Sequence, residues 1–312
     1  MTRLAVRRVA AAVALLAAAS MLAGCARPSA SAGVPLAGGD GGGLPRSQPA
    51  TEQLDAGALQ AAAAGAAQSG ARVFLAARHG HLVLEHYASG SSAADLIDGG
   101  TMAQALPALA AGAAVAEGKL AADTSRFDAA SLATLVPTAT STPYADYVSQ
   151  RVWQPINAAA ARFSADANGA VRADCCLAAR AGDWLRVGIV LLQTGSFEGN
   201  IIVPADWVTR MRRPLADDAT RGFGIWLPVN GRDPEFADAE AFAVRDIYFL
   251  RGAGGTRLWL APSLQLAVLY IAAPGAAATD HTALVNQAIR AVQDRPQENA
   301  EQNLLQQLVP GH

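Results

Sequence analysis

The segment from Thr101 to Leu120 constrains the possible folds more than any other part of the chain. Small residues fill its middle, notably Ala108, Ala110, Ala111, Ala113 and Ala114. Alanine favours the helix, and its short side chain lets neighbouring elements approach closely. Pro107 removes a backbone donor near the start, so the first helical turn is expected to be distorted. The segment therefore predicts a buried helix that serves as a central packing element.

The segments on either side of this helix show a mixed pattern of helices and strands. Helical spacing of apolar residues is found over 54–67, 144–152, 177–192, 204–211 and 279–292. Strand-like runs are found over 73–77, 82–87, 222–228, 243–250, 256–260 and 266–272. Strands at both ends with helices between them predict an α/β protein of the α+β type. The expected architecture is an antiparallel sheet built from both termini, with helices on its faces.

The N-terminus has the order of a secretory signal peptide. A basic start (Arg3, Arg7 and Arg8) precedes an apolar run over 9–22, and Leu-Ala-Gly stands directly before Cys25. We expect residues 1–24 to be removed and Cys25 to be lipidated, which anchors the protein to a membrane without spanning it. An ordinary signal peptide with a chance cysteine is the alternative. Because Ala26 replaces the aspartate typical of inner-membrane retention, we expect the outer membrane, facing the periplasm.

The composition of the rest of the chain predicts three regions: a linker, a folded domain and a tail. Residues 25–50 are rich in Gly, Ser, Pro and Ala and predict a flexible linker after the lipidated cysteine. Residues 51–295 carry the periodic segments and predict the folded domain, and 296–312 predict a polar C-terminal tail.

Charge and cysteine usage exclude some classes of function. The 24 basic residues include three in residues 1–24, which hold no acid, so the mature chain with its 26 acids carries a net charge of −5. No basic field indicates nucleic-acid binding. Besides Cys25 the cysteines are Cys175 and Cys176. Adjacent cysteines close a strained ring poorly, so we expect them reduced, as small apolar residues at a helix start.

The Thr101–Leu120 segment resembles the nucleophile helix of the serine β-lactamase and penicillin-binding-protein superfamily. In that family Ser-x-x-Lys precedes an alanine-rich helix that ends in Glu-Gly-Lys-Leu, as residues 117–120 do here. Segment 144–155 is similar to the family's helix that ends in a Trp-x-Pro turn, and 249–262 resembles the strand that borders its active site. Segment 173–186 is similar to one common in the family's 6-aminohexanoate-dimer-hydrolase and esterase-like branch. The resemblance implies a β-lactamase-like fold. Only residues 120–143 separate Lys119 from Tyr144, so it also implies a reduced helical lobe.

The residues that carry the family's chemistry are replaced. The family's serine attacks a carbonyl, and the lysine one turn later helps to take its proton. The matching positions are Thr101 and Gln104, and an amide has no useful basicity. Because Lys119 is the only lysine and Ala116 stands three residues before it, Ser-x-x-Lys and Lys-Thr-Gly are both absent. Tyr-x-Asn, Ser-x-Asn and Gly-x-Ser-x-Gly are absent too.

The strand expected beside the nucleophile helix carries other residues in place of Lys-Thr-Gly. Arg251 supplies a positive charge but no base, and backbone donors near Gly254 and Gly255 could preserve an oxyanion hole. We therefore expect no catalytic residues, and the degenerate positions are Thr101, Gln104, Arg251, Gly254 and Gly255.

No cofactor or metal is expected. His79 and His81 lie in a predicted hairpin turn without the geometry of a zinc site, and we expect them to be exposed turn residues. The five tryptophans are expected in the core or between lobes: Trp153, Trp184, Trp207, Trp226 and Trp259.

Three functions remain open. The favoured one is a lipid-anchored, catalytically inactive envelope protein that binds a cell-wall ligand or a protein partner. The second is a weak esterase or amidase that uses Thr101 with a base from elsewhere. The third is a structural domain that packs beside another envelope protein.

Overall fold

The computed structural model describes residues 33–123, 128–236 and 238–294. The predicted signal peptide, Cys25 and the predicted polar tail lie outside the described residues. Within the described ranges, every helix is too short or too polar to cross a membrane.

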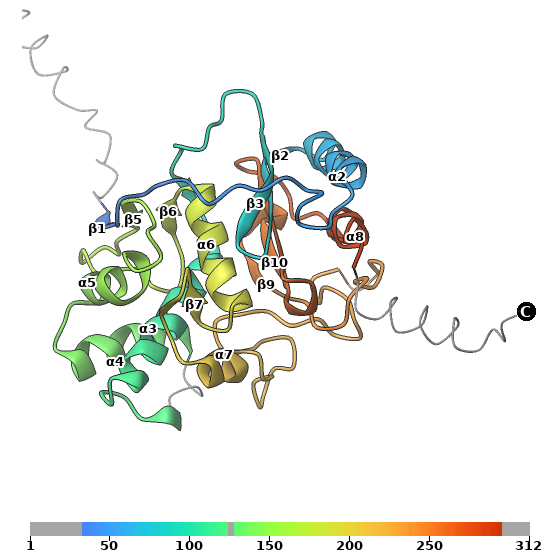
Figure 1. The fold of residues 1–312 in the computed structure, drawn as a ribbon. Coiled ribbons are helices and arrows are strands. Elements are labelled where there is room, and N and C mark those ends of the chain that lie inside the picture. Colours follow the sequence, from blue (N-terminus) through green and yellow to red (C-terminus); the bar gives the residue numbers. More distant parts are fainter. Residues whose placement is uncertain (1–32, 124–127, 237, 295–312) are drawn as a thin grey trace, which may run out of the picture. The chain divides into compact units, whose positions relative to one another are not determined.

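The larger sheet joins the two ends of the domain. Its strands lie in the order β3-β2-β11-β10-β9, and every neighbouring pair is antiparallel. The strands are β2 (Ala71–Arg78), β3 (His81–Tyr87), β9 (Tyr248–Arg251), β10 (Arg257–Ala261) and β11 (Leu266–Ala272). Because β2 pairs with β11, the early hairpin and the late strands form one sheet (Figure 1). The predicted antiparallel sheet from both ends of the domain is confirmed.

Helices cover both faces of this sheet. α2 (Ala56–Gln68) and α8 (Thr282–Arg290) pack together on one face, and α6 (Ala181–Leu192) lies on the other (Figure 1). Successive side chains of a strand point to opposite faces. Accordingly Phe74 belongs to the core beneath α2 and α8, whereas Leu75 belongs to the core that includes α6.

The alanine-rich segment forms the centre of the second core. A 3-10 turn, η1 (Gly100–Gln104), leads into α3 (Ala105–Ala116), and every residue from Ala105 to Ala114 is buried. The helix packs against α4 (Ala129–Thr140) and α5 (Tyr144–Val148). The predicted buried helix and its irregular first turn are both confirmed.

Gly112 marks the closest packing on α3. A Cβ atom at this position would lie 2.4 Å from Cδ1 of Trp207 in α7 (Ala205–Met211). The indole cannot swing away freely, because its Nε1 donates a 2.9 Å hydrogen bond to Ala108 O. We therefore expect Gly112→Ala to lower the free energy of unfolding by about 2–3 kcal/mol, measured by urea denaturation.

The matched control is Gly182→Ala in α6, where nothing lies within 4 Å of the added Cβ. It should be neutral or stabilising by up to about 1 kcal/mol, because alanine is the better helix former. Equal effects of the two substitutions would contradict the close packing of Trp207 on α3.

A smaller sheet lies beside the helical lobe. Its order is β1-β5-β6-β4, with β1 (Val34–Leu36), β4 (Ile97–Asp98), β5 (Ala161–Phe163) and β6 (Leu177–Ala179). The remaining short elements are the hairpin β7 (Ser196–Phe197) and β8 (Asn200–Ile201), the π-helical turn η3 (Ser149–Trp153), and the 3-10 turns η4 (Ala253–Gly255) and η5 (Pro262–Leu264).

Residues 33–50 are part of the folded domain, which differs from the flexible linker expected over 25–50. Leu36 and Leu44 are buried, and the compact unit begins at Gly33. A Cβ at Gly38 would lie 2.3 Å from the carbonyl carbon of Ala159, so this glycine allows two backbones to pass in close contact. Arg186 of α6 also donates a hydrogen bond to the Gly42 carbonyl.

Several predicted elements differ from the observed ones; for example, the strand expected over 243–250 begins only at Tyr248. The helix expected over 177–192 begins with strand β6, and α6 starts only at Ala181. The strand expected over 222–228 is a loop, in which Gly224 has a φ of +73° and Trp226 makes an isolated bridge to Phe249. The left-handed turn at Gly224 interrupts the extended backbone that a strand requires.

Candidate functional site

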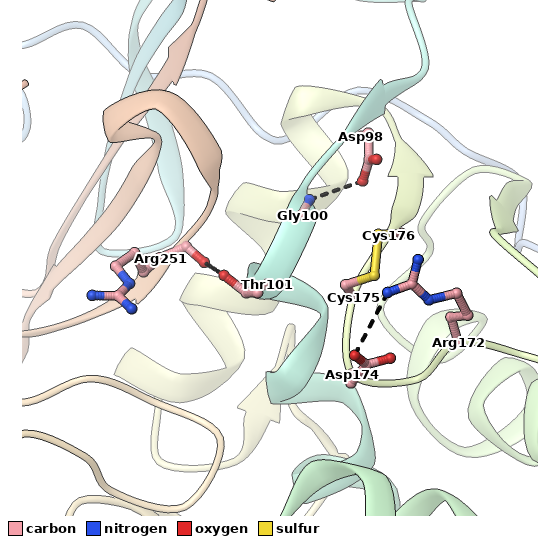
Figure 2. The surroundings of a disulfide bond; sticks show 8 residues. All are labelled: Asp98, Gly100, Thr101, Arg172, Asp174, Cys175, Cys176 and Arg251. Carbon is pink, nitrogen blue, oxygen red and sulfur yellow. Dashed lines mark hydrogen bonds and ion pairs between the residues drawn. A yellow bond between two sulfur atoms is a disulfide. The ribbon is translucent and has the colours of Figure 1, made fainter. Parts of the chain in front are cut away.

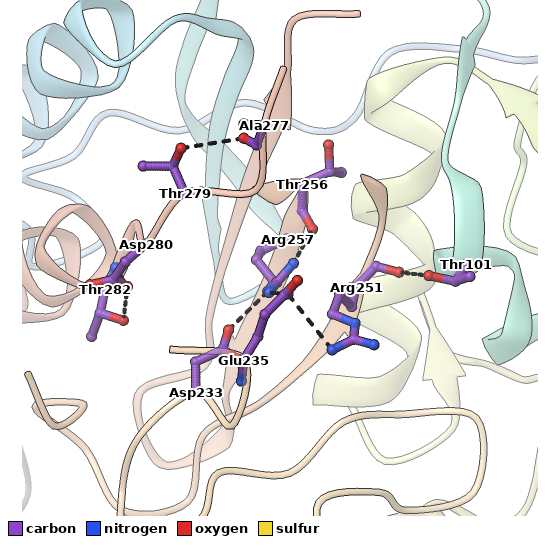
Figure 3. Close-up of polar contacts among 10 residues, drawn as sticks. All are labelled: Thr101, Asp233, Glu235, Arg251, Thr256, Arg257, Ala277, Thr279, Asp280 and Thr282. Carbon is purple, nitrogen blue, oxygen red and sulfur yellow. Dashed lines mark hydrogen bonds and ion pairs between the residues drawn. The ribbon is translucent and has the colours of Figure 1, made fainter. Parts of the chain in front are cut away.

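Thr101 and Gln104 lie at the start of the buried helix, beside the end of strand β9. Thr101 is exposed, and its Oγ1 donates a 2.5 Å hydrogen bond to the backbone carbonyl of Arg251. The Gln104 Oε1 atom accepts a 3.3 Å hydrogen bond from Nη2 of Arg221. The structure therefore brings three of the residues singled out in the sequence into one place, and adds Arg221 (Figure 3 shows Thr101 and Arg251).

Glycines allow the two backbones to approach here. A Cβ on Gly252 would lie 2.8 Å from Gly99 O, and one on Gly100 would lie 3.3 Å from Ala253 N. Gly254 and Gly255 follow in η4 with φ values of +64° and +84°. The η4 turn therefore lies directly against the segment that precedes Thr101.

The surroundings of Thr101 provide no base. Among the described residues, no Lys, His, Asp or Glu side chain hydrogen-bonds to Thr101 Oγ1, whose acceptor is a backbone carbonyl. Lys119 lies beyond the far end of α3, a helix roughly 18 Å long, where its Nζ contacts Glu117 at 2.7 Å. A carbonyl oxygen orients the hydroxyl but cannot take its proton.

Two arginines and a tryptophan gather beside Gln104. The guanidinium carbon of Arg251 lies 3.5 Å from the centre of the Trp226 ring, and that of Arg221 lies 5.3 Å from it. Burial lowers the pKa of Arg251, and the Glu235 carboxylate opposes this shift. Arginine nevertheless stays protonated in proteins. We call Thr101, Gln104, Arg221, Trp226 and Arg251 the Thr101 site.

A buried cluster of ion pairs lies next to Arg251. Arg257 in β10 is 1% exposed, and its Nε donates to Asp233 Oδ2 at 2.9 Å. Its Nη2 donates to Glu235, whose carboxylate also lies 3.7 Å from Nη1 of Arg251 (Figure 3). The cluster ties the loop around Glu235 to the sheet and fixes the acid that faces Arg251.

A cavity of about 280 Å³ opens beside Gly100 and η4. Its polar lining side chains already have partners: Arg72 contacts Asp95 at 3.0 Å, and Asp98 accepts from Gly100 N at 2.8 Å. The volume is at the small end for ligand pockets, which hold roughly 300–1,000 Å³. The cavity therefore has room for a small chemical group only, and it is lined by none of the five residues of the Thr101 site.

The adjacent Cys175 and Cys176 are joined by a disulfide (Figure 2). The prediction of two reduced cysteines at a helix start is wrong, because both lie in the loop before β6. Neighbouring helical side chains point about 100° apart. Cys176 instead has a φ of +74°, and this left-handed turn allows the ring to close.

The hairpin histidines differ from simple exposed turn residues. Both are partly exposed, yet Nδ1 of His79 lies 2.8 Å and Nδ1 of His81 lies 3.3 Å from the carboxylate of buried Glu52. His281 is buried and its ring lies 3.9 Å from that of Tyr270. Within residues 33–123, 128–236 and 238–294, no group of three or more His, Cys, Asp and Glu side chains could hold a metal ion.

Glu52 predicts a pH effect on stability. Burial raises the pKa of its carboxyl, but hydrogen bonds from His79 and Ser47 and the charge of His81 outweigh burial and lower it. A lowered folded-state pKa means that the unfolded chain binds more protons, so this stabilisation is present above about pH 4.3 and is lost as the pH falls further.

The stability advantage of wild type over Glu52→Gln should therefore shrink between about pH 5 and about pH 3. Urea denaturation at each pH measures it, with exposed Glu240→Gln as the matched control. An advantage that grows with acidity would contradict the lowered pKa.

Comparisons with known proteins relate this geometry to a fold. No family model matches the sequence, and no curated protein matches it. Solved structures do match. A protein named as a 6-aminohexanoate-dimer hydrolase from Bacillus anthracis aligns with a TM-score of 0.66 and 13% identity, over 86% of this chain and 92% of that chain.

Two further solved structures align with the same fold. A family VIII carboxylesterase has a TM-score of 0.57 and 13% identity, over 77% of this chain and 97% of its own. A penicillin-binding-protein homolog from Caulobacter crescentus has a TM-score of 0.57 and 10% identity, over 76% and 97%. At these identities the likeness shows the fold alone. The described chain has the fold of the serine β-lactamase and penicillin-binding-protein-like hydrolases, as the sequence resemblance predicts.

Proposed function

We propose that this protein is a lipid-anchored component of the bacterial cell envelope that binds a ligand without turning it over. The observation that carries the proposal is the hydrogen bond from Thr101 Oγ1 to the Arg251 carbonyl. The sequence resemblance matches Thr101 to the family's serine and Gln104 to its lysine, and Gln104 is bonded to Arg221. A hydroxyl without a base is a weak nucleophile.

The envelope location is supported by the sequence. The basic start, the apolar run and Leu-Ala-Gly before Cys25 agree with one another as a lipoprotein signal. A lipid on Cys25 holds the domain at the outer membrane, facing the periplasm. A protein partner or a neighbouring envelope domain is the alternative to a cell-wall ligand.

The chemistry of the Thr101 site favours a ligand with a carboxylate, such as a cell-wall peptide. Arg221 and Arg251 present two guanidinium groups on one tryptophan ring. Guanidinium groups bind carboxylates with paired, charge-assisted hydrogen bonds, and the exposed part of Trp226 offers an apolar surface beside them.

Calorimetry tests this binding. The full chain carrying Cys25→Ala, which stays free of lipid, is titrated with the dipeptide D-Ala-D-Ala and with its C-terminal amide. We expect the acid to bind at least tenfold more tightly than the amide, and Arg251→Gln to weaken the acid roughly 10- to 100-fold, because a hydrogen bond between charged groups contributes about 1.5–3 kcal/mol.

Arg213→Gln is the matched control, because Arg213 is exposed and lies outside the Thr101 site. Equal affinities for the acid and the amide would contradict carboxylate recognition. No binding of either would favour a protein partner over a cell-wall ligand.

The alternative, a weak esterase or amidase that uses Thr101, keeps one observation in its favour. Thr101 is exposed, so an ester could reach its hydroxyl. The reaction still requires a group that removes the proton, and the observed acceptor is a carbonyl. Arg251 and Arg221 cannot serve, because guanidinium groups stay protonated.

A further inference from the structure

The disulfide between Cys175 and Cys176 lies against the backbone that leads to Thr101. β4 and β6 pair antiparallel, and their ladder continues past Asp98. Gly99 N donates to Leu177 O at 3.0 Å, and Cys176 N donates to Gly100 O at 3.0 Å. Figure 2 shows the bonded cysteines on one side of the Gly100–Thr101 segment and Arg251 on the other.

The backbone of Cys176 has a conformation that its side chain disfavours. Its φ is +74°, in the left-handed region that L-residues other than glycine rarely adopt. In this conformation its N–H points at Gly100 O, and its own carbonyl accepts from Ser164 N at 2.8 Å. A ring through two adjacent residues restricts the torsions of the peptide between them, so the disulfide helps to hold this turn.

The two cysteines differ in access. Cys175 is 7% exposed, whereas Cys176 is more open to solvent. In thiol–disulfide exchange, a thiolate attacks one sulfur and expels the other. The more open Cys176 is therefore the residue that an incoming thiolate reaches first.

We infer that Cys175–Cys176 is a thiol–disulfide exchange site whose reduction by a dithiol releases the Gly99–Thr101 segment. A thiolate of the dithiol attacks Cys176 Sγ, the S–S bond breaks, and Cys175 leaves as a thiolate that takes a proton. The second thiol of the dithiol then attacks the mixed disulfide, which frees Cys176 as a thiol and leaves the dithiol oxidised. In sum, two electrons and two protons pass to the protein.

Opening the disulfide ring affects the Thr101 site through the backbone of Cys176, Gly100 and Thr101. Once the ring is open, Cys176 relaxes toward negative φ, and its N–H no longer points at Gly100 O. Gly100 and Thr101 then lose the partner that holds them on the side opposite Arg251. The inference concerns the geometry of this segment and does not depend on which ligand, if any, the Thr101 site binds.

The first arm of the test counts thiols and follows amide exchange. The full chain carrying Cys25→Ala is alkylated with iodoacetamide before and after treatment with dithiothreitol, and hydrogen exchange is followed by mass spectrometry. We expect no alkylation before reduction and two alkylated cysteines after it. We also expect the amides of Gly99 and Cys176 to exchange about tenfold faster after reduction, because they lose hydrogen bonds that protect them. Peptides from β2 and β11 should be unchanged.

Two double variants separate the backbone from the side chains. Cys175→Ser with Cys176→Ser lacks the ring and should exchange like the reduced protein. Cys175→Ser with Cys176→Gly also lacks the ring, but glycine accepts a positive φ, so it should exchange like the oxidised protein.

Three results would overturn the inference. One is alkylation of both cysteines without reductant. Another is equal exchange of the Gly99 and Cys176 amides in the oxidised and reduced protein, or in the two double variants. The third is faster exchange throughout β2 and β11 on reduction, since the disulfide would then stabilise the whole domain and not this segment.

Discussion

Replacing Arg257 with alanine is expected to lower the free energy of unfolding by about 3–5 kcal/mol, the cost of leaving a buried charge without its partner. Arg257 is 1% exposed and Asp233 is 2% exposed, and their atoms lie 2.9 Å apart. Without the guanidinium, the Asp233 carboxylate remains buried in the core, and Glu235 loses the group that fixes it. The structure around Arg251 should therefore loosen together with the domain.

Urea denaturation of the full chain measures this effect. Arg290→Ala is the matched control, because Arg290 makes an exposed ion pair with Glu240 at 3.7 Å, and such pairs contribute about 0–1 kcal/mol. Arg257→Met with Asp233→Asn should recover part of the loss, since it removes both charges together. A loss below about 1 kcal/mol in Arg257→Ala would show that water reaches Asp233 and that the cluster is not a structural support.

Replacing Cys25 with alanine is expected to abolish lipid attachment and to leave the protein unprocessed or mislocalised. The lipobox presents the Cys25 thiol as the acceptor, and alanine has no atom to carry the lipid. Each buried CH₂ group of an attached chain contributes about 0.8 kcal/mol to membrane binding, so loss of the lipid removes the anchor. Metabolic labelling with a palmitate analogue, followed by fractionation, measures both effects.

The matched control replaces Cys175 and Cys176 with alanine and leaves Cys25 in place. This double variant should keep the label and stay with the membrane. Unchanged labelling of Cys25→Ala would show that the lipid sits elsewhere or that the signal is an ordinary one.

The sequence predicted the elements that local pattern determines. The alanine-rich helix follows from its small, helix-favouring residues, and the strands of the larger sheet follow from strand-like apolar runs, because these elements are buried in the core. The positions of Thr101 and Gln104 followed from the helix, since its burial fixes where its first turn lies.

Composition gave a wrong prediction where glycines allow close packing and do not make the chain flexible. The glycine-rich stretch before Thr51 has the composition of a flexible chain. Gly38, however, lets the backbone pack closely against Ala159 and does not serve conformational flexibility. Only two apolar residues, Leu36 and Leu44, mark this segment as buried. The prediction that the adjacent cysteines are reduced was wrong for a related reason, because the left-handed turn at Cys176 depends on hydrogen bonds to residues distant in the sequence.

The charged part of the Thr101 site could not be predicted from spacing. Arg221 and Trp226 come from a loop without periodicity, and Arg251 comes from a strand of the larger sheet. The tryptophans were expected in the core or between lobes, and Trp226 packs against one core with its ring half-buried under two guanidinium groups.

The most direct test of the account is covalent labelling of Thr101. The full chain carrying Cys25→Ala is incubated with a fluorophosphonate and, separately, with a labelled penicillin, and its mass and tryptic peptides are then measured. Thr101 Oγ1 donates to a carbonyl, and no Lys, His, Asp or Glu side chain in the described part of the chain hydrogen-bonds to it. The account therefore predicts no adduct on the peptide that contains Thr101. An adduct on Thr101 with either reagent would contradict it and favour the alternative, an esterase or amidase that uses Thr101.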